Sequence, residues 1–371
     1  MKVLLTATVQ SHICQFHRPL VEMLHQHGCQ VHVAARDNLA EKNGLTLDFA
    51  DKVYNVPFSR SPKSADNIRA YKQLKAIIEE EHYDIIHCNT PMGGVVTRLA
   101  AQKARKSGTK VFYTAHGFHF YKGASKTGWL VYYPVEKLLS RITDTIITIN
   151  NEDRLCAEAQ FGCKVSYIHG VGADVTKYRV LPEEENTEFR VDNGLSDRFI
   201  ILCTGELNKN KNQSTVIRAI ALLKEKGLNP ILLLAGNGPE DGNLKKLAAE
   251  LGVEKSVILV GYRTDLERYI NISDLIVSAS LREGLGMNLI EGMLCQKPVV
   301  ASDNRGHRDL VQNGVNGYRV LSGSPEAFAE KIEELMLDDE KRRSMAQNGY
   351  ALALKFTKEQ VKKELNDIYF A

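Results

Sequence analysis

Short apolar runs rich in valine and isoleucine recur along the whole chain and alternate with stretches of helical periodicity. Strands that alternate with helices in this way form parallel sheets with crossover helices, so the sequence predicts an α/β fold. In the first half we expect strands at residues 2–8, 30–35, 51–56, 84–88, 110–115, 144–149 and 164–169. In the second half we expect them at residues 199–205, 230–236, 256–261, 274–279, 298–303 and 316–321.

At 371 residues the chain exceeds the size at which one hydrophobic core stops growing, so we expect two domains. Residues 176–189 are polar and lack periodicity, which is typical of a linker. The prediction is therefore two doubly wound, Rossmann-like domains that face a cleft, at residues 1–175 and 190–354. Ligands of such sheets bind outside the carboxyl ends of the strands, so the strand-to-helix loops should carry the chemistry.

Composition narrows the class of protein. Apolar residues make up 43% and charged residues 25% of the chain, as in soluble globular proteins. The seven cysteines are scattered and form no C-x-x-C pair, which favours a reducing compartment and argues against a zinc ribbon. The N-terminal run is short enough to be a first strand, and no apolar run approaches the roughly 18 residues of a membrane span. We therefore expect a cytoplasmic protein whose membrane contact, if any, is peripheral.

Charge is distributed unevenly between the halves. Residues 1–180 contain 23 lysines and arginines against 16 aspartates and glutamates, whereas the remainder contains 25 against 29. A basic first half suggests an anionic substrate or an anionic membrane surface as a partner, although random surface variation explains it equally well. One helix, predicted at residues 94–106, opens a basic run formed by Arg98, Lys103, Arg105, Lys106 and Lys110. We expect no nucleic-acid partner.

The stretch SLREGLGMNLIEGM holds two carboxylates eight positions apart, Glu283 and Glu291. Glycines resist helix formation, so the helix should begin near Met287, with Glu283 in the loop and Glu291 one turn inside the helix. The spacing corresponds to roughly 12 Å, about the length of a sugar, a diphosphate and a ribose. The positive end of the helix between the two acids would stabilise an anion. The alternative is an ordinary helix start with solvated acids.

Three further loops of the second half follow strands. In CTGELNKNKNQ, Lys211 lies just before a helix expected to begin near Gln213, where a cation and free N–H groups suit a diphosphate; a solvated lysine is the alternative. The run GNGPEDG departs from the dinucleotide-binding fingerprint by one residue, and we interpret it as a tight turn. In VGYRTD, Tyr262 and Arg263 occupy a loop tip that could contact a nucleobase and a phosphate, and Asp265 is expected to cap the next helix.

In the first half, TAHGFHFYKGASK presents His116 and His119 after a strand. Two histidines three positions apart could bind a metal, but no other ligand type lies near them, so contacts to sugar or phosphate are favoured, with Lys122 and Lys126 adding positive charge. Asn89 and His12 occupy neighbouring strand-to-helix loops. The chain has no G-x-S-x-G elbow, no Walker lysine motif and no H-E-x-x-H, which argues against a covalent hydrolase or a nucleoside triphosphatase.

Taken together, these motifs resemble the GT-B-fold glycosyltransferases of family 4 over essentially the whole chain. The Glu-x₇-Glu signature at residues 283–291 is followed by GHRDLVQNGVNGY, and GELNKNKN, GNGP and GYRTD occur in the family's order. The first half, with NTPMGG, TAHGFHFYKG and HGVGAD, is similar to bacterial enzymes that build capsule, exopolysaccharide or O-antigen units. In this family the last helix often returns to the first domain, as residues 355–371 could do here.

The resemblance implies roles for individual residues. Glu291 would hold the ribose and Glu283 the sugar of a nucleotide-sugar. The residues that would bind the donor are Gly205, Lys211, Tyr262, Arg263, Arg282, Glu283, Leu285, Gly286 and Glu291. The catalytic residues would be His116, Glu283 and Lys211. The residues on the acceptor side would be His12, Asn89, His119 and Lys122.

The resemblance further implies a retaining transferase that needs neither metal nor cofactor and moves a sugar, favouring a UDP-sugar, to a lipid-linked or saccharide acceptor. Two departures stand out: Glu206 replaces an arginine of many members, for which Arg263 or Arg282 could substitute, and the usual N-terminal glycine pair is absent. Two alternatives stay open. One is a nucleotide-sugar epimerase of related shape, and the other a non-catalytic nucleotide-sugar-binding subunit of a polysaccharide assembly complex.

Overall fold

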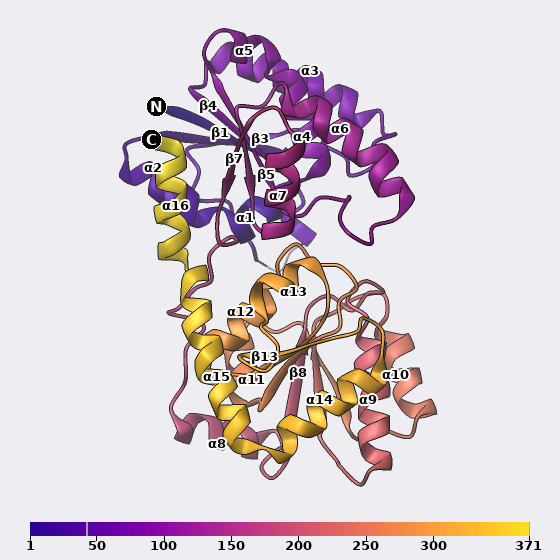
Figure 1. Cartoon of the computed structure of the whole chain (residues 1–371). Helices are drawn as coiled ribbons and strands as arrows, with labels where there is room; N and C mark the ends of the chain where they lie inside the picture. Colours follow the sequence, from indigo (N-terminus) through magenta and orange to yellow (C-terminus); the bar gives the residue numbers. More distant parts are fainter. Residues whose placement is uncertain (42–43, 371) are drawn as a thin grey trace. The chain divides into compact units, whose positions relative to one another are not determined.

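The computed structural model describes residues 1–41 and 44–370, and the chain forms two compact units. The first unit comprises Met1–Gly172 together with helix α16 (Lys358–Phe370), and the second comprises Ala173–Thr357. Figure 1 shows helices packed against a sheet in each unit. Both sheets are wholly parallel, which confirms the predicted fold of two doubly wound α/β units.

The first unit has a seven-stranded sheet in the order β3-β2-β1-β4-β5-β6-β7. Its strands are β1 (Lys2–Val9), β2 (Gln30–Arg36), β3 (Lys52–Asn55), β4 (Ile85–Asn89), β5 (Lys110–Ala115), β6 (Thr145–Thr148) and β7 (Lys164–Tyr167). Its remaining helices are α1 (Gln10–Phe16), α2 (Arg18–Gln26), η1 (Leu39–Glu41), α3 (Asp66–Glu81), α4 (Pro91–Ala100), α5 (Gln102–Lys106), η2 (Gly128–Tyr132), α6 (Tyr133–Ser140) and α7 (Asn151–Gln160). The strand order reverses between β1 and β4.

The second unit has a six-stranded sheet in the order β10-β9-β8-β11-β12-β13, which reverses between β8 and β11. Its strands are β8 (Ile200–Thr204), β9 (Ile231–Ala235), β10 (Val257–Gly261), β11 (Leu275–Ser278), β12 (Val299–Ser302) and β13 (Gly317–Val320). Its helices are α8 (Glu183–Asp192), α9 (Gln213–Glu225), α10 (Asp241–Glu250), α11 (Leu266–Ile272), α12 (Met287–Leu294), α13 (Arg305–Leu310), α14 (Pro325–Leu337), α15 (Asp339–Ala353) and η3 (Leu354–Phe356). No helix within the described residues is long and apolar enough to cross a membrane.

The central strands are buried on both faces. Every residue of β4 and of β8 is buried, because helices cover both sides of each sheet. A strand in this position has no solvated face, so its sequence is a continuous apolar run rather than an alternating one. This is why the apolar runs located the strands, and each predicted segment overlaps one observed strand.

The predicted helix at residues 94–106 is two helices, α4 and α5, which meet at Ala101. The basic run in this region is not a free cationic face. The Arg98 side chain is fully buried, pairs with Glu136 at 2.8 Å and lies over the ring of Tyr113. Two other members are paired as well, Lys103 with Glu79 and Arg105 with Asp144.

Residues 176–189, which the sequence assigned to a linker, belong to the second unit and contain the start of α8. The side-chain amide of Asn271 donates to the Arg179 carbonyl at 2.9 Å. The backbone N–H of Leu181 donates to Asn271 at 2.9 Å. These contacts hold the segment on the second unit, since polar side chains satisfy backbone groups that a mobile linker would expose to water.

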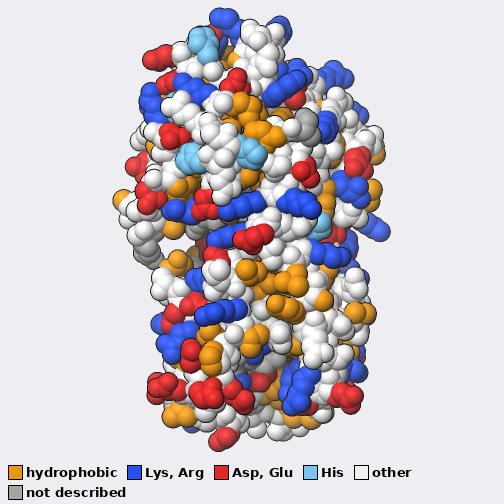
Figure 2. Space-filling model, turned by 90° about the vertical axis from the view of Figure 1, so that its left-hand side faces the viewer, with side chains coloured by type: hydrophobic (Ala, Val, Ile, Leu, Met, Phe, Trp, Pro, Cys, Tyr) orange, Lys and Arg blue, Asp and Glu red, His pale blue; other side chains and the backbone are white. Residues whose placement is uncertain are grey.

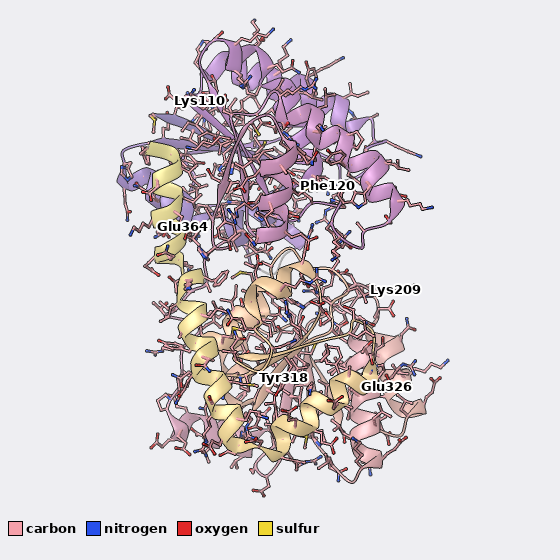
Figure 3. All side chains as sticks on the ribbon, viewed as in Figure 1. Lys110, Phe120, Lys209, Tyr318, Glu326 and Glu364 are labelled. Carbon is pink, nitrogen blue, oxygen red and sulfur yellow. The ribbon has the colours of Figure 1, made fainter. Side chains whose placement is uncertain are left out.

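Helix α16 belongs to the first unit, although it ends the chain. It packs beside α2, as Figure 1 shows, and Lys362 pairs with Glu22 at 2.8 Å. Glu364, labelled in Figure 3, accepts hydrogen bonds from the backbone and the ring of His169. Near its end, the hydroxyl of Tyr369 lies 2.5 Å from Nδ1 of His87.

The Tyr369 contact generates a stability prediction. Tyr369→Phe should lower the free energy of unfolding of the first unit by about 1–3 kcal/mol, because Nδ1 of buried His87 loses its hydrogen-bond partner. Trp129 is the single tryptophan and lies in the first unit, so its fluorescence during urea unfolding reports on that unit. Tyr132→Phe, which removes a hydroxyl from an exposed side chain of the same unit, is the control. Equal unfolding midpoints for both variants would contradict the prediction.

Candidate functional site

In the second unit, the loops after β8 and β11 meet at the carboxyl edge of the sheet, because these strands pair where the strand order reverses. The ammonium of Lys211 lies 2.6 Å from Oε1 of Glu283. The backbone N–H of Leu281 donates to the Asn210 carbonyl at 2.8 Å, and the Asn210 side chain donates to the Arg282 carbonyl at 3.0 Å. The two loops are thus tied together around one ion pair.

The β8 loop is shaped to present Lys211. Gly205 has a φ of +128°, and a Cβ there would lie 3.2 Å from the Lys211 side chain, so the glycine leaves room for the lysine. The side chain of Asn208 accepts from the Lys211 N–H at 2.9 Å and donates to Glu206 at 3.0 Å. Helix α9 begins at Gln213, as the sequence predicted. Glu206, the departure from the family pattern, is therefore an exposed carboxylate that braces this loop.

Helix α12 begins at Met287, as predicted, after Gly286 in the left-handed region. At that φ of +117° a side chain is disfavoured, and a Cβ would lie 3.0 Å from the ring of His307. No side chain of the described residues caps the helix, which leaves its first N–H groups suited to an anion. Glu283 accordingly lies in the loop, and Glu291 lies one turn inside the helix, as predicted.

The two carboxyl groups differ in protonation. Burial works to raise the pKa of Glu283, but the ammonium of Lys211 outweighs it, so the pKa lies below its ordinary value. Desolvation raises the pKa of Glu291 to about 7, although a hydrogen bond with Tyr178 and the charge of Lys177 oppose the shift. Near neutral pH, Glu283 is therefore an anion that neutralises Lys211, whereas Glu291 is divided between its acid and its carboxylate.

Two polar side chains beside the start of α12 are buried without a hydrogen-bond partner among the described residues. They are the amide of Asn288, at both its oxygen and its nitrogen, and Nε2 of His307. Nδ1 of His307 lies 2.8 Å from the Ser302 carbonyl, and burial lowers its pKa, so the neutral ring presents Nε2 as an acceptor. Unsatisfied buried groups are rare in folded proteins and often mark a site that a ligand completes.

The sequence analysis missed Asn288, His307 and Tyr178. His307 lies in the GHRDL motif that supports the family resemblance, and Asn288 directly follows the glycines of the acidic motif. The positions of His307 and Asn288 within these motifs could have identified them as site residues. The burial of the Asn288 amide and of Nε2 of His307 without partners among the described residues, and the contact of Tyr178 with Glu291, depend on packing that sequence spacing does not reveal.

The loop after β10 differs from its prediction in one respect. Asp265 occupies the N-cap position of α11, but its carboxylate does not cap the helix. It instead holds the guanidinium of Arg263 through two hydrogen bonds, of 2.9 and 2.8 Å. Arg263 is thus already engaged, whereas Tyr262 beside it and Arg282 in the acidic loop are exposed. Arg263 and Arg282 were both considered as substitutes for the family's arginine at position 206. Arg282 is exposed and directly precedes Glu283 in the chain.

The run at residues 236–242 is a turn, as interpreted. The N–H of Gly236 donates to the Gly261 carbonyl at 2.8 Å, and a Cβ at Gly236 would lie 2.0 Å from the Gly205 carbonyl. A Cβ at Gly238 would lie 2.2 Å from the Leu207 carbonyl. These glycines therefore allow the loops after neighbouring strands to approach closely.

In the first unit, His12 and His116 come together. His12 lies in helix α1 and not in the strand-to-helix loop that the sequence predicted, because α1 begins at Gln10 directly after β1, whereas His116 lies in the loop after β5. Their Nε2 atoms are 3.3 Å apart, and Nε2 of His116 lies 3.2 Å from Oδ1 of Asn89 at the end of β4. The Asn89 amide also donates to the Thr6 carbonyl at 3.3 Å. Three of the residues expected at the reacting or acceptor side therefore form one polar cluster.

Two further histidines adjoin this cluster, His17 and His87. Burial lowers the pKa of all four rings, to about 4 for His116 and about 3 for His87, so each is neutral near pH 7. A cavity of about 20 Å³ lies beside His17, His87 and His116. Nε2 of His17 is buried without a hydrogen-bond partner among the described residues. Neutral rings in this setting can exchange hydrogen bonds with a polar ligand.

Three histidines, His12, His17 and His116, are placed to hold a metal ion, because their ligand atoms all lie within 4.8 Å of one another. Among the described residues, no other group of three His, Cys, Asp or Glu side chains is placed in this way. The sequence had weighed a metal at His116 and His119 instead. His119 is not part of the group and stacks on Tyr132, with ring centroids 4.6 Å apart. Lys122, also expected on the acceptor side, is exposed, and its N–H donates to Glu152.

Comparison with known proteins defines the class. The family Glycosyl transferase 4-like matches residues 2–150, and Glycosyl transferases group 1 matches residues 185–352. The structure of Anabaena HepE in complex with UDP and glucose has the same fold, with a TM-score of 0.80, 23% identity and 99% of each chain covered. WaaG, a glycosyltransferase involved in lipopolysaccharide biosynthesis, gives a TM-score of 0.77 at 16% identity, with both chains covered completely. The chain is a GT-B-fold protein and belongs to this glycosyltransferase family.

Individual relatives agree with this assignment. The chain is 44% identical to the putative glycosyltransferase EpsD of Bacillus subtilis (strain 168), over all of this chain and 96% of that protein. It is 25% identical to the UDP-Gal:alpha-D-GlcNAc-diphosphoundecaprenol alpha-1,3-galactosyltransferase of Escherichia coli, over 84% of this chain and 82% of that one. It is 24% identical to the capsular polysaccharide biosynthesis glycosyltransferase CapM of Staphylococcus aureus, over 95% and 92%.

The contrast between the two acids predicts opposite effects on stability. The folded state keeps the Glu291 proton up to a pH of about 7, whereas an unfolded glutamate loses it near 4.5, so wild-type stability falls as pH rises through this window. Glu291→Gln should remove that decline. At pH values above about 7, the ligand-free variant should be more stable than wild type by about 1–3 kcal/mol.

Glu283→Gln should instead destabilise the protein by about 1–3 kcal/mol at neutral pH, because Lys211 loses its partner. The stability that Glu283 supplies is present above the ordinary glutamate pKa and is lost as the pH falls below it. Urea unfolding at several pH values, followed by circular dichroism, measures both effects. Shifts of the same sign in the two variants would overturn the assigned protonation states.

Proposed function

We propose that this chain is a retaining glycosyltransferase that moves a sugar from a UDP-sugar to a lipid-linked or saccharide acceptor in the synthesis of a cell-surface polysaccharide. The observation that carries the proposal is the Lys211–Glu283 pair directly before the uncapped start of α12, with Glu291 one turn into that helix. Glu283, the helix N-terminus with Lys211 beside it, and Glu291 occur in the order in which a nucleotide-sugar presents its sugar, its diphosphate and its ribose.

The diphosphate is assigned to Lys211 and to the N–H groups at Leu285 and Gly286. A cation and a helix N-terminus both favour a negative charge, and that charge grows as the sugar departs. The stabilisation is therefore greater in the transition state than in the bound donor, which is the condition for catalysis. We propose that these groups take the place of a metal ion.

The sugar is assigned to Glu283 and the ribose to Glu291. In the ligand-free protein Glu283 already accepts from Lys211, and hydroxyls of the sugar would supply further donors once the lysine turns to the diphosphate. Ribose hydroxyls that donate to Glu291 would favour its carboxylate, and so lower the pKa that desolvation has raised. The unpartnered acceptor Nε2 of His307 and the amide of Asn288 are suited to further donor hydroxyls.

In a transfer without a covalent enzyme intermediate, retention of configuration requires the acceptor to approach from the side that the diphosphate leaves. A phosphate oxygen of the leaving group is proposed to take the acceptor's proton, so that no protein base is needed for that transfer. In the first unit, the family resemblance assigns His116 a contact with the reacting sugar. Its ring is neutral at pH 7, so it can exchange a hydrogen bond with a hydroxyl without adding charge.

The relatives support the choice of donor and acceptor. HepE has been crystallised with UDP-glucose, and the Escherichia coli relative is named for a UDP-galactose donor and a diphosphoundecaprenol acceptor. A Mycobacterium tuberculosis relative, 26% identical over 68% of this chain, is named for GDP-mannose instead. The donor screen therefore compares nucleotides as well as sugars.

The test is a screen of UDP-, GDP- and ADP-sugars with a polyprenyl-diphosphate-linked sugar as acceptor, in EDTA. A UDP-sugar should release UDP only when the acceptor is present, and NMR of the product should show the donor's anomeric configuration. Lys211→Gln should slow release by about 10- to 100-fold through loss of a charge-assisted contact. Lys209→Gln, which removes an exposed lysine of the same loop, is the control.

Three outcomes would refute the proposal. Epimerised donor without acceptor would favour the epimerase, and an absolute need for added Mg²⁺ or Mn²⁺ would exclude the metal-free mechanism. Donor binding without any turnover would favour a non-catalytic subunit.

A further inference from the structure

An apolar strip lies exposed on the first unit, along the continuous helical segment formed by η2 and α6. Leu130 and Leu138 are 76% and 63% exposed. The other large apolar side chains of this segment with high exposure are Trp129, Val131, Tyr132 and Val135. Val131, Val135 and Leu138 follow the spacing of one helix face, so the strip is a surface rather than scattered residues. We define it as the apolar strip of residues 129–138.

The opposite face of this segment is firmly held. Leu139 and Glu136 are buried, and Glu136 pairs with the buried Arg98 at 2.8 Å. Trp129, at the edge of the strip, is held on one side only: its indole donates to the Tyr121 carbonyl at 3.3 Å and its ring contacts Phe120, which is labelled in Figure 3, while the residue stays 41% exposed. The strip is thus presented by an anchored helix and is not a core face exposed by loose packing.

Within residues 121–142, the exposed charged side chains are all basic. Residues 121–142 contain four basic side chains, all exposed, which are Lys122, Lys126, Lys137 and Arg141. The single acidic residue of that range, Glu136, is buried and neutralised by Arg98. By contrast, basic and acidic side chains are interspersed on the face shown in Figure 2. This excess of positive charge complements an anionic surface and would repel an identical strip on a second copy.

The strip is joined directly to the loop that carries acceptor-side candidates. The ring of Tyr132 stacks on His119, with centroids 4.6 Å apart and planes 22° apart. Gly128 lies against the same residue, since a Cβ there would come within 2.3 Å of the His119 carbonyl. Whatever the strip binds is therefore held beside this loop.

We propose that the apolar strip of residues 129–138 inserts into the headgroup region of a bilayer that contains anionic lipid, and so docks the first unit on the surface that holds a lipid-linked acceptor. That the surface holds a lipid-linked acceptor rests on the proposed function, whereas insertion of the strip into a bilayer does not. Aromatic rings that are apolar at one side and polar at the other, such as those of Trp129 and Tyr132, favour this interface. Surrounding lysines add attraction to anionic headgroups. This surface replaces the basic run of residues 98–110 as the predicted membrane contact.

The single tryptophan makes the test direct, because it lies in the strip. The full chain is mixed with vesicles of phosphatidylcholine alone or with added phosphatidylglycerol, at low and high salt. Sedimentation should increase with phosphatidylglycerol and decrease with salt. Trp129 emission should shift to shorter wavelength on binding and be quenched by lipids brominated on the acyl chains.

Three double variants separate the contributions. Leu130→Gln with Leu138→Gln should weaken vesicle binding about tenfold or more, because two inserted leucines are lost. Lys126→Gln with Arg141→Gln should weaken it mainly at low salt. Leu321→Gln with Leu337→Gln, two leucines of the second unit that are 74% and 70% exposed, should bind as wild type does. Circular dichroism confirms that each variant is folded.

The outcomes distinguish this inference from the proposed function. Binding without any change in Trp129 emission, or equal binding by all three variants, would overturn insertion of the strip. A concentration-dependent emission shift without lipid, together with absence of vesicle binding, would assign the strip to a second copy of the chain. Vesicle binding without sugar transfer would leave insertion standing and count against the transferase. Transfer to a water-soluble acceptor by a variant that no longer binds vesicles would support both.

Discussion

The parallel pairing of β8 with β11 is the constraint on which the candidate donor site depends. The loops after these strands are some 70 residues apart in the sequence, yet they meet because the strand order reverses between the two strands. The ion pair between Lys211 and Glu283 is made across that point. A shift of either strand by one residue would turn its side chains to the opposite face and separate the loops.

In the ligand-free state this edge retains groups that folding alone has not satisfied. Desolvation keeps Glu291 partly protonated near pH 7, and the side chains of Asn288 and His307 hold buried polar atoms without partners among the described residues. Each is a cost that the rest of the fold offsets. A ligand that donates to the acid and to the ring, and bonds with the amide, would relieve these costs on binding, so the same features that lower stability would favour recognition.

The sequence predicted the features that depend on local chemistry. Buried parallel strands require continuous apolar runs, and the glycines before Met287 fix where α12 begins, so both could be located. Features that depend on partners distant in the sequence could not be predicted. The charge of Arg98 suggested a solvated face, but its guanidinium is buried against Glu136. The clustering of four histidines likewise follows from strand order and not from spacing in the chain.

The exposed strip of residues 129–138 illustrates the same limit. Its apolar content was visible in the sequence, yet an apolar helix in a chain of this kind is ordinarily a core helix. Only the structure shows that the strip faces outward, with the single acid of the surrounding range turned inward toward Arg98.

The most direct measurement compares binding of uridine, UDP and the UDP-sugar selected by the donor screen, by calorimetry, to wild type and three variants. Glu291→Ala should weaken all three ligands, because ribose is common to them. Lys211→Ala should weaken UDP and the UDP-sugar but not uridine, and Glu283→Ala should weaken the UDP-sugar alone, each about tenfold or more. If Glu283→Ala weakened uridine as much as the UDP-sugar, or if Glu291→Ala left all three unchanged, the assignment of the two acids to sugar and ribose would be wrong.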